Sequence, residues 1–225
     1  MLIKKILYRR FLNMLLCFLE NNIRFSEYSA LMRFVSPERI TKINSYIHEK
    51  DKILSLMAEL IARYDICRKG IADNDSIKFS NGEYGKPFLE NNTDYHFSYS
   101  HTEGCIAFAS DSREIGADVE LCRETDLGFT EFILTADEKE YIKKSSDRIS
   151  DFYRIWTAKE SYLKYLGIGM YKEMASFSIF DREISEHIYT GLFNRYVVSV
   201  CTEKKISDIK PEIITYEEIK KFMQK

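Results

Sequence analysis

The sequence has little of what marks unusual classes of protein. Its 225 residues include three prolines, nine glycines and one tryptophan, with no low-complexity run, so neither a long linker nor a disordered tail is expected. Hydrophobic residues make up 45% of the chain, which is enough for one large core or two small ones. The 33 basic and 35 acidic residues give a net charge of −2, and this balance argues against a nucleic-acid-binding protein.

Cysteine chemistry is also lacking. The cysteines are odd in number and widely scattered, with no C-x-x-C pair and no neighbouring histidine: Cys17, Cys67, Cys105, Cys122 and Cys201. This pattern is typical of reduced core residues, so it excludes a disulfide framework and predicts a cytoplasmic protein.

Long hydrophobic runs are absent too. Lys4, Lys5, Arg9 and Arg10 precede the apolar segment 11–19, an order that resembles a signal peptide. The segment is short and no small-residue cleavage site follows it, so we expect an amphipathic or core element there. No stretch is long enough to span a bilayer, and we expect no membrane association.

Helical and strand patterns alternate without the strict β-α-β rhythm or the glycine fingerprint of a doubly wound nucleotide-binding sheet. Ser36-Pro37-Glu38 predicts a helix start, and the apolar spacing from Ile40 to Tyr64 predicts one bent helix or two consecutive ones. Further helices are expected near residues 135–142, 156–166 and 216–223, and strands near 77–79, 96–99, 105–121, 176–180, 196–201 and 213–215. The fold class predicted is therefore α+β.

Two short segments carry the chemistry. Asp118 and Glu120 are separated by one residue in a predicted strand, so both carboxylates leave the same face. Trp156, Glu160 and Lys164 follow an i, i+4, i+8 spacing, which places them on one stripe of a helix. Three carboxylates with a nearby lysine suit Mg²⁺ on a polyphosphate, because Mg²⁺ prefers oxygen ligands and is usually completed by substrate phosphates.

Each segment also has an ordinary structural explanation. Paired acids are common on solvated strands, and a Glu-x-x-x-Lys pair on a helix surface contributes only about 0.2–0.5 kcal/mol. The only tryptophan of the chain lies on the Glu160 stripe, which argues against plain solvent-exposed surface. The residues alone leave both explanations open.

Together the segments resemble the signatures of a known family. Gly116 to Glu120 matches G-x-D-x-E, and Trp156 to Lys164 matches W-x-x-K-E-S-x-x-K, as in 4′-phosphopantetheinyl transferases of the surfactin-synthetase-activating type, in the holo-acyl-carrier-protein synthase superfamily. Three other blocks agree in order, namely 34–39, 84–87 and 97–101. The resemblance runs from about Phe34 to Phe180.

The resemblance implies a pseudo-symmetric monomer of two similar α+β halves, residues 1–112 and 113–225, with the active site in the cleft between them. It implies transfer of the phosphopantetheine arm of coenzyme A to a serine of an apo carrier protein, with release of adenosine 3′,5′-bisphosphate. The partner would be an acyl, peptidyl or aryl carrier with an acidic helix, from fatty-acid, polyketide or nonribosomal-peptide biosynthesis. Mg²⁺, or Mn²⁺, would be the cofactor.

The resemblance also assigns roles to residues. Asp118, Glu120 and Glu160 would hold the metal, and Lys164, with Lys159, would face the phosphate oxygens. Glu160 would act as base directly or through a water, with Glu138 as another candidate. His101 would contact the 3′-phosphate. The remaining coenzyme A contacts implied are Arg39, Lys42, Ser55, Lys86, Pro87 and Ser100.

The chain departs from the family at Leu54, where an arginine is usual; this change removes one expected phosphate contact. Residues 1–33 match poorly. Two alternative functions remain open, a Mg²⁺-dependent phosphohydrolase and a catalytically inactive homologue that binds coenzyme A or a carrier.

Overall fold

The computed structural model describes residues 12–20 and 24–224. The part of the N-terminal prediction that falls on residues 1–11 lies outside this range. In chain order the elements are β1 (Asn13–Phe18), α2 (Phe25–Tyr28), α3 (Pro37–Ser45), α4 (Glu49–Arg68), β2 (Phe79–Asn81), β3 (Pro87–Leu89), β4 (His96–Thr102), β5 (Cys105–Asp111), β6 (Ile115–Leu121), α5 (Ala136–Lys144), α6 (Arg148–Leu166), α7 (Arg182–Ser185), β7 (Ile188–Phe193), β8 (Tyr196–Thr202), β9 (Glu212–Ile213) and α8 (Tyr216–Met223).

The first half is a sheet covered by helices on one face. Its strand order is β4-β5-β1-β9, with β1, β5 and β4 antiparallel to one another. The strand β5 is buried along its whole length because both of its faces are covered. Ile106 and Phe108 pack into the core with α4, whereas Ala107 and Ala109 belong to a second core shared with the other half.

The second half repeats this arrangement. In each half a first strand leads through helices to an antiparallel hairpin, and the last strand of the hairpin pairs with the first strand. The order β6-β8-β7 thus corresponds to β1-β5-β4, and α6 packs on β6 and β8 much as α4 packs on the first sheet. The predicted α+β architecture of two similar halves is confirmed.

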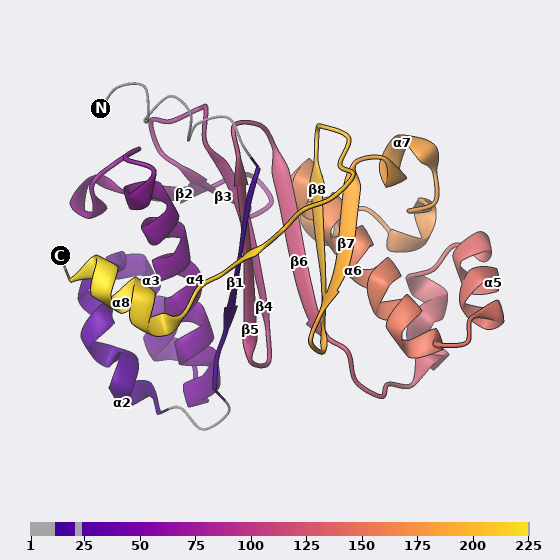
Figure 1. The fold of residues 1–225 in the computed structure, drawn as a ribbon, viewed down its shortest axis with the longest axis horizontal. Coiled ribbons are helices and arrows are strands. Elements are labelled where there is room, and N and C mark those ends of the chain that lie inside the picture. The colour runs from indigo at the N-terminus through magenta and orange to yellow at the C-terminus, as the bar shows by residue number, and fades with distance from the viewer. Residues whose placement is uncertain (1–11, 21–23, 225) are drawn as a thin grey trace.

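Figure 1 shows the two sheets side by side in the middle of the molecule, with helices on the outer sides. Most of the facing residues are small or β-branched and buried, among them Ala107, Ala109, Ala117 and Val200. Such side chains let the sheets approach closely. The strands β4 and β6, one from each half, contact each other without sharing a sheet.

The end of the chain returns to the first half. Figure 1 shows the segment after β8 crossing the sheets to reach α8, which packs against α4. Here β9 pairs in parallel with β1, and Ile214, Ile219 and Met223 join the first core. Residues 212–223 therefore pack with the opposite half from the one that precedes them.

The local signals account for most of the elements. Ser36 caps α3 by accepting a hydrogen bond from the Arg39 backbone N–H, with Pro37 at the first helical position. The apolar run from 40 to 64 forms two helices, α3 and α4. The strand expected at 176–180 is wrong, because these residues form the end of a 3₁₀ turn and a loop. The expected strand 105–121 is interrupted by a turn, giving β5 and β6.

A helix that crosses a bilayer must be long and predominantly apolar. Within residues 12–20 and 24–224, no helix combines the length and the apolar character that a bilayer crossing requires.

Candidate active site

The strand β6 and the helix α6 bring the three carboxylates together. Their close approach depends on Gly116, because a Cβ atom there would lie 1.9 Å from the backbone oxygen of Ser161 on α6. Two residues further along β6, Asp118 is 3% exposed and faces the same helix. The stripe predicted for α6 is therefore directed at the strand predicted to carry the acids.

Asp118 is held through one of its two oxygens. Its Oδ1 accepts hydrogen bonds from Lys164 Nζ at 2.7 Å and from Ser100 Oγ at 2.7 Å. Its Oδ2 is buried and has no hydrogen-bond partner among the described residues. A buried carboxylate oxygen without a donor is costly, so this atom is available for a cation or a polar ligand.

The other two acids are perturbed in the same direction. Burial raises the pKa of Glu160 to about 6, and the charges of Asp118 and Glu120 add to this while Lys164 opposes it. Burial and then Asp118 also raise the pKa of Glu120, against hydrogen bonds from Thr102 and Trp156. The three carboxylates thus repel one another in a region poor in water.

This arrangement suits a hard divalent cation in its donor chemistry. Besides Asp118 Oδ2, Glu160 Oε1 is buried and lacks a partner in the part of the chain that the structure describes. No three Asp, Glu, His or Cys side chains of the described ranges stand in a geometry that could already hold a metal ion. The positive charge next to Asp118 comes from Lys164 instead.

The sequence did not predict that hydroxyl groups of β4 meet these acids. Ser98, Ser100 and Thr102 alternate along β4 on the face turned towards β6, and Thr102 Oγ1 donates to Glu120 Oε2 at 3.2 Å. Their period of two was a visible signal in a predicted strand. It gave no indication of which segment the hydroxyls would meet.

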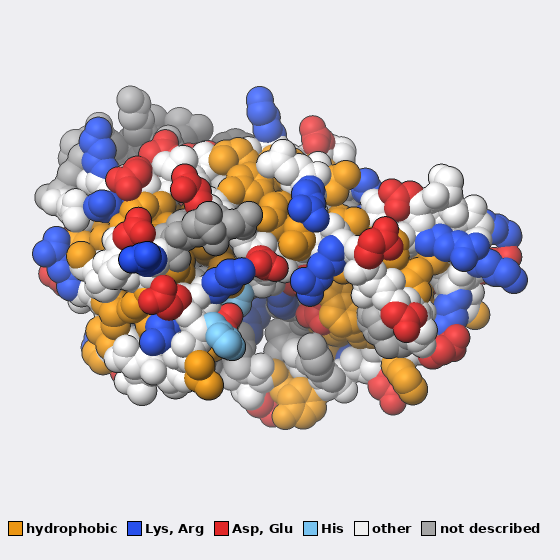
Figure 2. Space-filling view, turned by 90° about the horizontal axis from the view of Figure 1, so that it is seen from below, with side chains coloured by type: hydrophobic (Ala, Val, Ile, Leu, Met, Phe, Trp, Pro, Cys, Tyr) orange, Lys and Arg blue, Asp and Glu red, His pale blue; other side chains and the backbone are white. Residues whose placement is uncertain are grey.

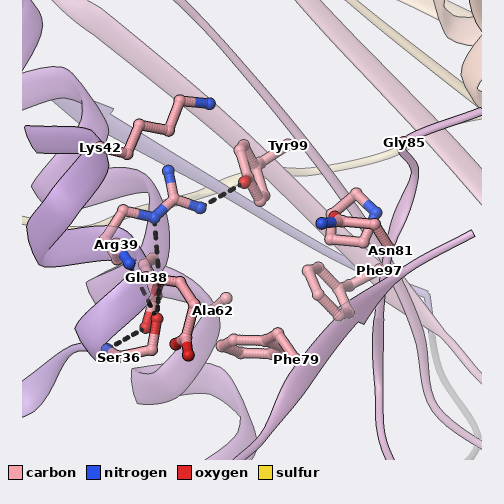
Figure 3. A pocket seen from close by; sticks show the side chains of 12 residues that line it. Ser36, Glu38, Arg39, Lys42, Ala62, Phe79, Asn81, Gly85, Phe97 and Tyr99 are labelled. Atoms are coloured by element: carbon pink, nitrogen blue, oxygen red, sulfur yellow. Dashed lines mark hydrogen bonds and ion pairs between the residues drawn. The ribbon is translucent and has the colours of Figure 1, made fainter. Parts of the chain in front are cut away.

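A cavity of about 230 Å³ lies in the first half between α3, α4, β2 and β4. Figure 3 shows Arg39 at one end and the rings of Phe79 and Phe97 at the other. The guanidinium of Arg39 donates to Glu59 at 2.9 Å and to Tyr99 Oη at 2.8 Å, so its orientation is fixed. The cavity combines a cationic end with an aromatic one, as suits a phosphate attached to a planar base.

Lys42 and His101 extend this site. Lys42 lines the cavity, and Figure 3 shows its side chain extending past Arg39. Loss of solvation and then Arg39 lower the pKa of Lys42. Partial desolvation lowers the pKa of His101, and the charges of Lys164, Lys42 and Arg39 lower it further. Figure 2 shows charged and histidine side chains around a hollow between the halves on this face.

Ser55 and Ser100 serve other side chains in this arrangement. Ser55 is 2% exposed, and its hydroxyl accepts from Arg39 at 3.3 Å, so it supports the guanidinium. Ser100 donates to Asp118, as described above. The resemblance implied both residues as coenzyme A contacts; in the structure their hydroxyls contact Arg39 and Asp118.

Lys86 and Pro87 diverge from each other. Pro87 lines the cavity with Arg39, but Lys86 is turned away and donates to Glu114 Oε2 at 2.5 Å and to the Tyr165 carbonyl at 3.3 Å. Lys86 therefore caps the C-terminal end of α6 from the other half. The resemblance implied that Lys86 contacts coenzyme A. In this conformation, however, Lys86 does not face the cavity.

Lys159 is not brought to the carboxylates. Its ammonium group is fully buried, pairs with Glu138 at 2.9 Å and donates to the Met174 carbonyl at 2.8 Å. Lys159 directly precedes Glu160 in the sequence, but helical geometry places the two side chains on different faces of α6. The implied roles of Lys159 at the phosphates and of Glu138 as a base are thus replaced by a buried ion pair that joins α5 to α6.

Comparison with known proteins agrees with this geometry. Residues 2–113 match the family model described as "4′-phosphopantetheinyl transferase, N-terminal", and residues 114–215 match "4′-phosphopantetheinyl transferase superfamily". The chain is 33% identical over 207 residues to the 4′-phosphopantetheinyl transferase gsp of Aneurinibacillus migulanus, covering 85% of this chain and 86% of that protein. It is 33% identical over 162 residues to Sfp of Bacillus subtilis (strain 168), covering 71% and 70% of the two chains.

A third relative is matched over nearly its whole length. The 4′-phosphopantetheinyl transferase ffp of Bacillus subtilis is 29% identical over 216 residues, which is 89% of this chain and 96% of that protein. The two family models together span both halves of the fold. On this similarity the chain belongs to the 4′-phosphopantetheinyl transferase superfamily.

Proposed function

We propose that the protein transfers the 4′-phosphopantetheine arm of coenzyme A to a serine hydroxyl of an apo carrier protein. In this reaction the serine oxygen attacks the phosphorus that bears pantetheine. The bond from that phosphorus to the bridging diphosphate oxygen breaks, adenosine 3′,5′-bisphosphate leaves, and the serine proton passes to a base. The observation that carries the proposal is the adjacency of a cationic, aromatic-lined cavity and a partly buried carboxylate cluster, which consecutive residues of β4, Tyr99 and Ser100, contact from the two sides.

The cavity supports binding of the nucleotide end of coenzyme A. Arg39 and Lys42 would neutralise the 3′-phosphate, with His101 nearby, while Phe79 and Phe97 offer apolar surface to the adenine. Partial desolvation and the charges of three cations lower the pKa of His101, and this favours the neutral ring at pH 7. It would therefore contribute a hydrogen bond rather than a positive charge.

The carboxylates support the use of Mg²⁺ or Mn²⁺. Asp118, Glu120 and Glu160 would hold the ion, which when bound would neutralise charge on the diphosphate of coenzyme A. Lys164, now 2.7 Å from Asp118, is the cation of this chain best placed to meet the same oxygens. These residues position the diphosphate and offset its charge, which is most of what phosphoryl transfer requires of a protein.

Glu160 is the candidate base. A pKa of about 6 leaves its carboxylate mostly ionised at pH 7 yet more basic than an ordinary glutamate. It would accept the serine proton directly or through a water. The partner would be a carrier whose acidic helix complements the cationic mouth of the cleft, and we propose that the enzyme acts on it as a cytoplasmic monomer.

The test uses purified protein, coenzyme A, Mg²⁺ and an apo carrier protein, followed by intact-mass spectrometry of the carrier. Transfer adds the mass of the phosphopantetheine arm to the carrier. Nucleotide release without a mass gain would instead indicate a phosphohydrolase, and binding without either product an inactive homologue. Asp118→Asn should abolish the mass gain, whereas Asp111→Asn, a control at a buried aspartate that ends β5, should retain it.

A further inference from the structure

Three hydroxyl side chains of β4 form a row along the border between the halves. Ser98, Ser100 and Thr102 are alternate residues, so they share one face of the strand. Their cross-strand neighbours on β5 are Ala109, Ala107 and Cys105, which belong to the core shared with the second half. The hydroxyl row, as we call these three residues, therefore points out of the first half and towards the second.

Each member of the row reaches β6. Ser98 Oγ accepts from the Ala117 backbone N–H at 3.0 Å, Ser100 Oγ donates to Asp118 Oδ1 at 2.7 Å, and Thr102 Oγ1 donates to Glu120 Oε2 at 3.2 Å. Because β4 and β6 belong to different sheets, these side-chain hydrogen bonds replace a backbone ladder between them. Two of the three end on carboxylates proposed to hold the metal.

The bonds determine which carboxylate oxygens remain free. Ser100 and Lys164 both donate to Oδ1 of Asp118, and this leaves Oδ2 as a buried oxygen without a partner. Without Ser100, rotation about the Cβ–Cγ bond of Asp118 would be restrained by Lys164 alone. Thr102 engages one oxygen of Glu120, a longer and more flexible side chain, and restrains it together with the hydrogen bond from Trp156.

We propose that Ser100 and Thr102 are positioning residues for the metal ligands and that neither serves to bind coenzyme A. Their hydroxyls hold Asp118 and Glu120 in the orientation that directs free oxygens at one ion. Because they belong to the half that contains the cationic cavity, they also fix that cavity relative to the carboxylates. The inference rests on the proposed metal site, but it concerns hydrogen bonds that exist without the metal.

Direct Mn²⁺ binding to the full-length protein, measured by electron paramagnetic resonance without coenzyme A, tests this role. Removing a hydrogen-bond partner of a metal ligand typically weakens metal binding about 10–100-fold. We expect losses of that size for Ser100→Ala and for Thr102→Val, and recovery for Thr102→Ser. Ser98→Ala is the matched control, because among the described residues its hydroxyl bonds only to the Ala117 backbone N–H. Its Mn²⁺ affinity should match that of the wild type.

Steady-state kinetics distinguish positioning from substrate contact. At saturating metal, both variants should keep the wild-type KM for coenzyme A, with Thr102→Ser restoring kcat. Wild-type Mn²⁺ affinity in Ser100→Ala and Thr102→Val would overturn the inference, as would a raised KM for coenzyme A with unchanged metal binding. If the wild type itself binds no Mn²⁺ while Asp118→Asn still transfers the arm, the proposed metal site fails first and the inference with it.

Discussion

Replacing Glu160 by glutamine is expected to stabilise the protein in the absence of metal while it abolishes transfer. In the folded chain this carboxylate is desolvated and lies near Asp118 and Glu120, with one buried oxygen that has no hydrogen-bond partner among the described residues. Glutamine has nearly the same shape and no charge. The substitution therefore removes electrostatic repulsion without leaving a cavity.

The magnitude follows from the pKa of Glu160, which rises from 4.5 to about 6 on folding. That difference corresponds to about 2 kcal/mol at most, because each pKa unit is worth about 1.36 kcal/mol. Glu160→Gln should therefore raise the free energy of unfolding by up to about 2 kcal/mol at pH 8. An amide N–H that finds no acceptor would reduce the gain.

The sign of the pH dependence is determined by which state binds the proton more tightly. Since the folded protein holds the Glu160 proton up to about pH 6 and the unfolded chain only to about 4.5, the folded state carries more protons between these values. Stability therefore falls as pH rises through this window, and the full loss is present above about pH 7. At pH 5 the loss should be only about 0.8 kcal/mol.

Urea unfolding of both proteins in EDTA at pH 5 and pH 8 checks this reasoning. Glu160→Gln should be the more stable protein at pH 8, and the difference should shrink at pH 5. The exposed Glu173→Gln serves as the control for a general effect of removing a negative charge. A Glu160→Gln protein no more stable than wild type at pH 8, or a gain equal at both pH values, would refute the repulsion argument.

Three other predictions concern packing, a buried charge and substrate recognition. Gly116→Ala should lower the free energy of unfolding by about 3 kcal/mol or more, measured by urea denaturation, because the added methyl meets helix backbone rather than a side chain that can move; a loss under 1 kcal/mol would contradict the close β6–α6 contact. Lys159→Met should cost about 3–5 kcal/mol by leaving Glu138 buried without its cation, and adding Glu138→Gln should restore much of it; equal stability of the single and double variants would refute the pairing. Arg39→Ala and Lys42→Ala should raise the KM for coenzyme A more than that for dephospho-coenzyme A, and equal rises would place the 3′-phosphate elsewhere.

The carboxylate site could be predicted because local periodicity specified it. Two acids separated by one residue on a strand must share a face, and the i, i+4, i+8 stripe of α6 keeps Glu160 and Lys164 together. The structure adds that both faces meet at Gly116, where the missing side chain allows contact. The family resemblance and the α+β class were confirmed, since the motifs and alternating elements are local signals.

Partners distant in the sequence could not be predicted in this way. The capping pattern of residues 135–138 indicates a helix start, but nothing local shows that Glu138 also neutralises Lys159. Lys86 precedes a proline in a turn, and only the packing of the two halves reveals the Tyr165 carbonyl that it caps. The strand expected at 176–180 failed for a related reason, because those residues wrap around Lys159 instead of pairing with a strand.

The equivalent helices of the two halves each present an acid, but in different surroundings. In the first half, α4 presents Glu59, which lies between Arg39 at 2.9 Å and Arg63 at 2.8 Å. That acid is neutralised, so it stiffens the guanidinium that faces the cavity. In the second half, α6 presents Glu160 beside two other acids, and burial and repulsion keep its pKa high. Glu59 is paired with two arginines and can only support a binding site. Glu160 keeps an oxygen without a hydrogen-bond partner among the described residues, which can accept a cation or a proton. Its raised pKa is therefore the property that the proposed reaction would use.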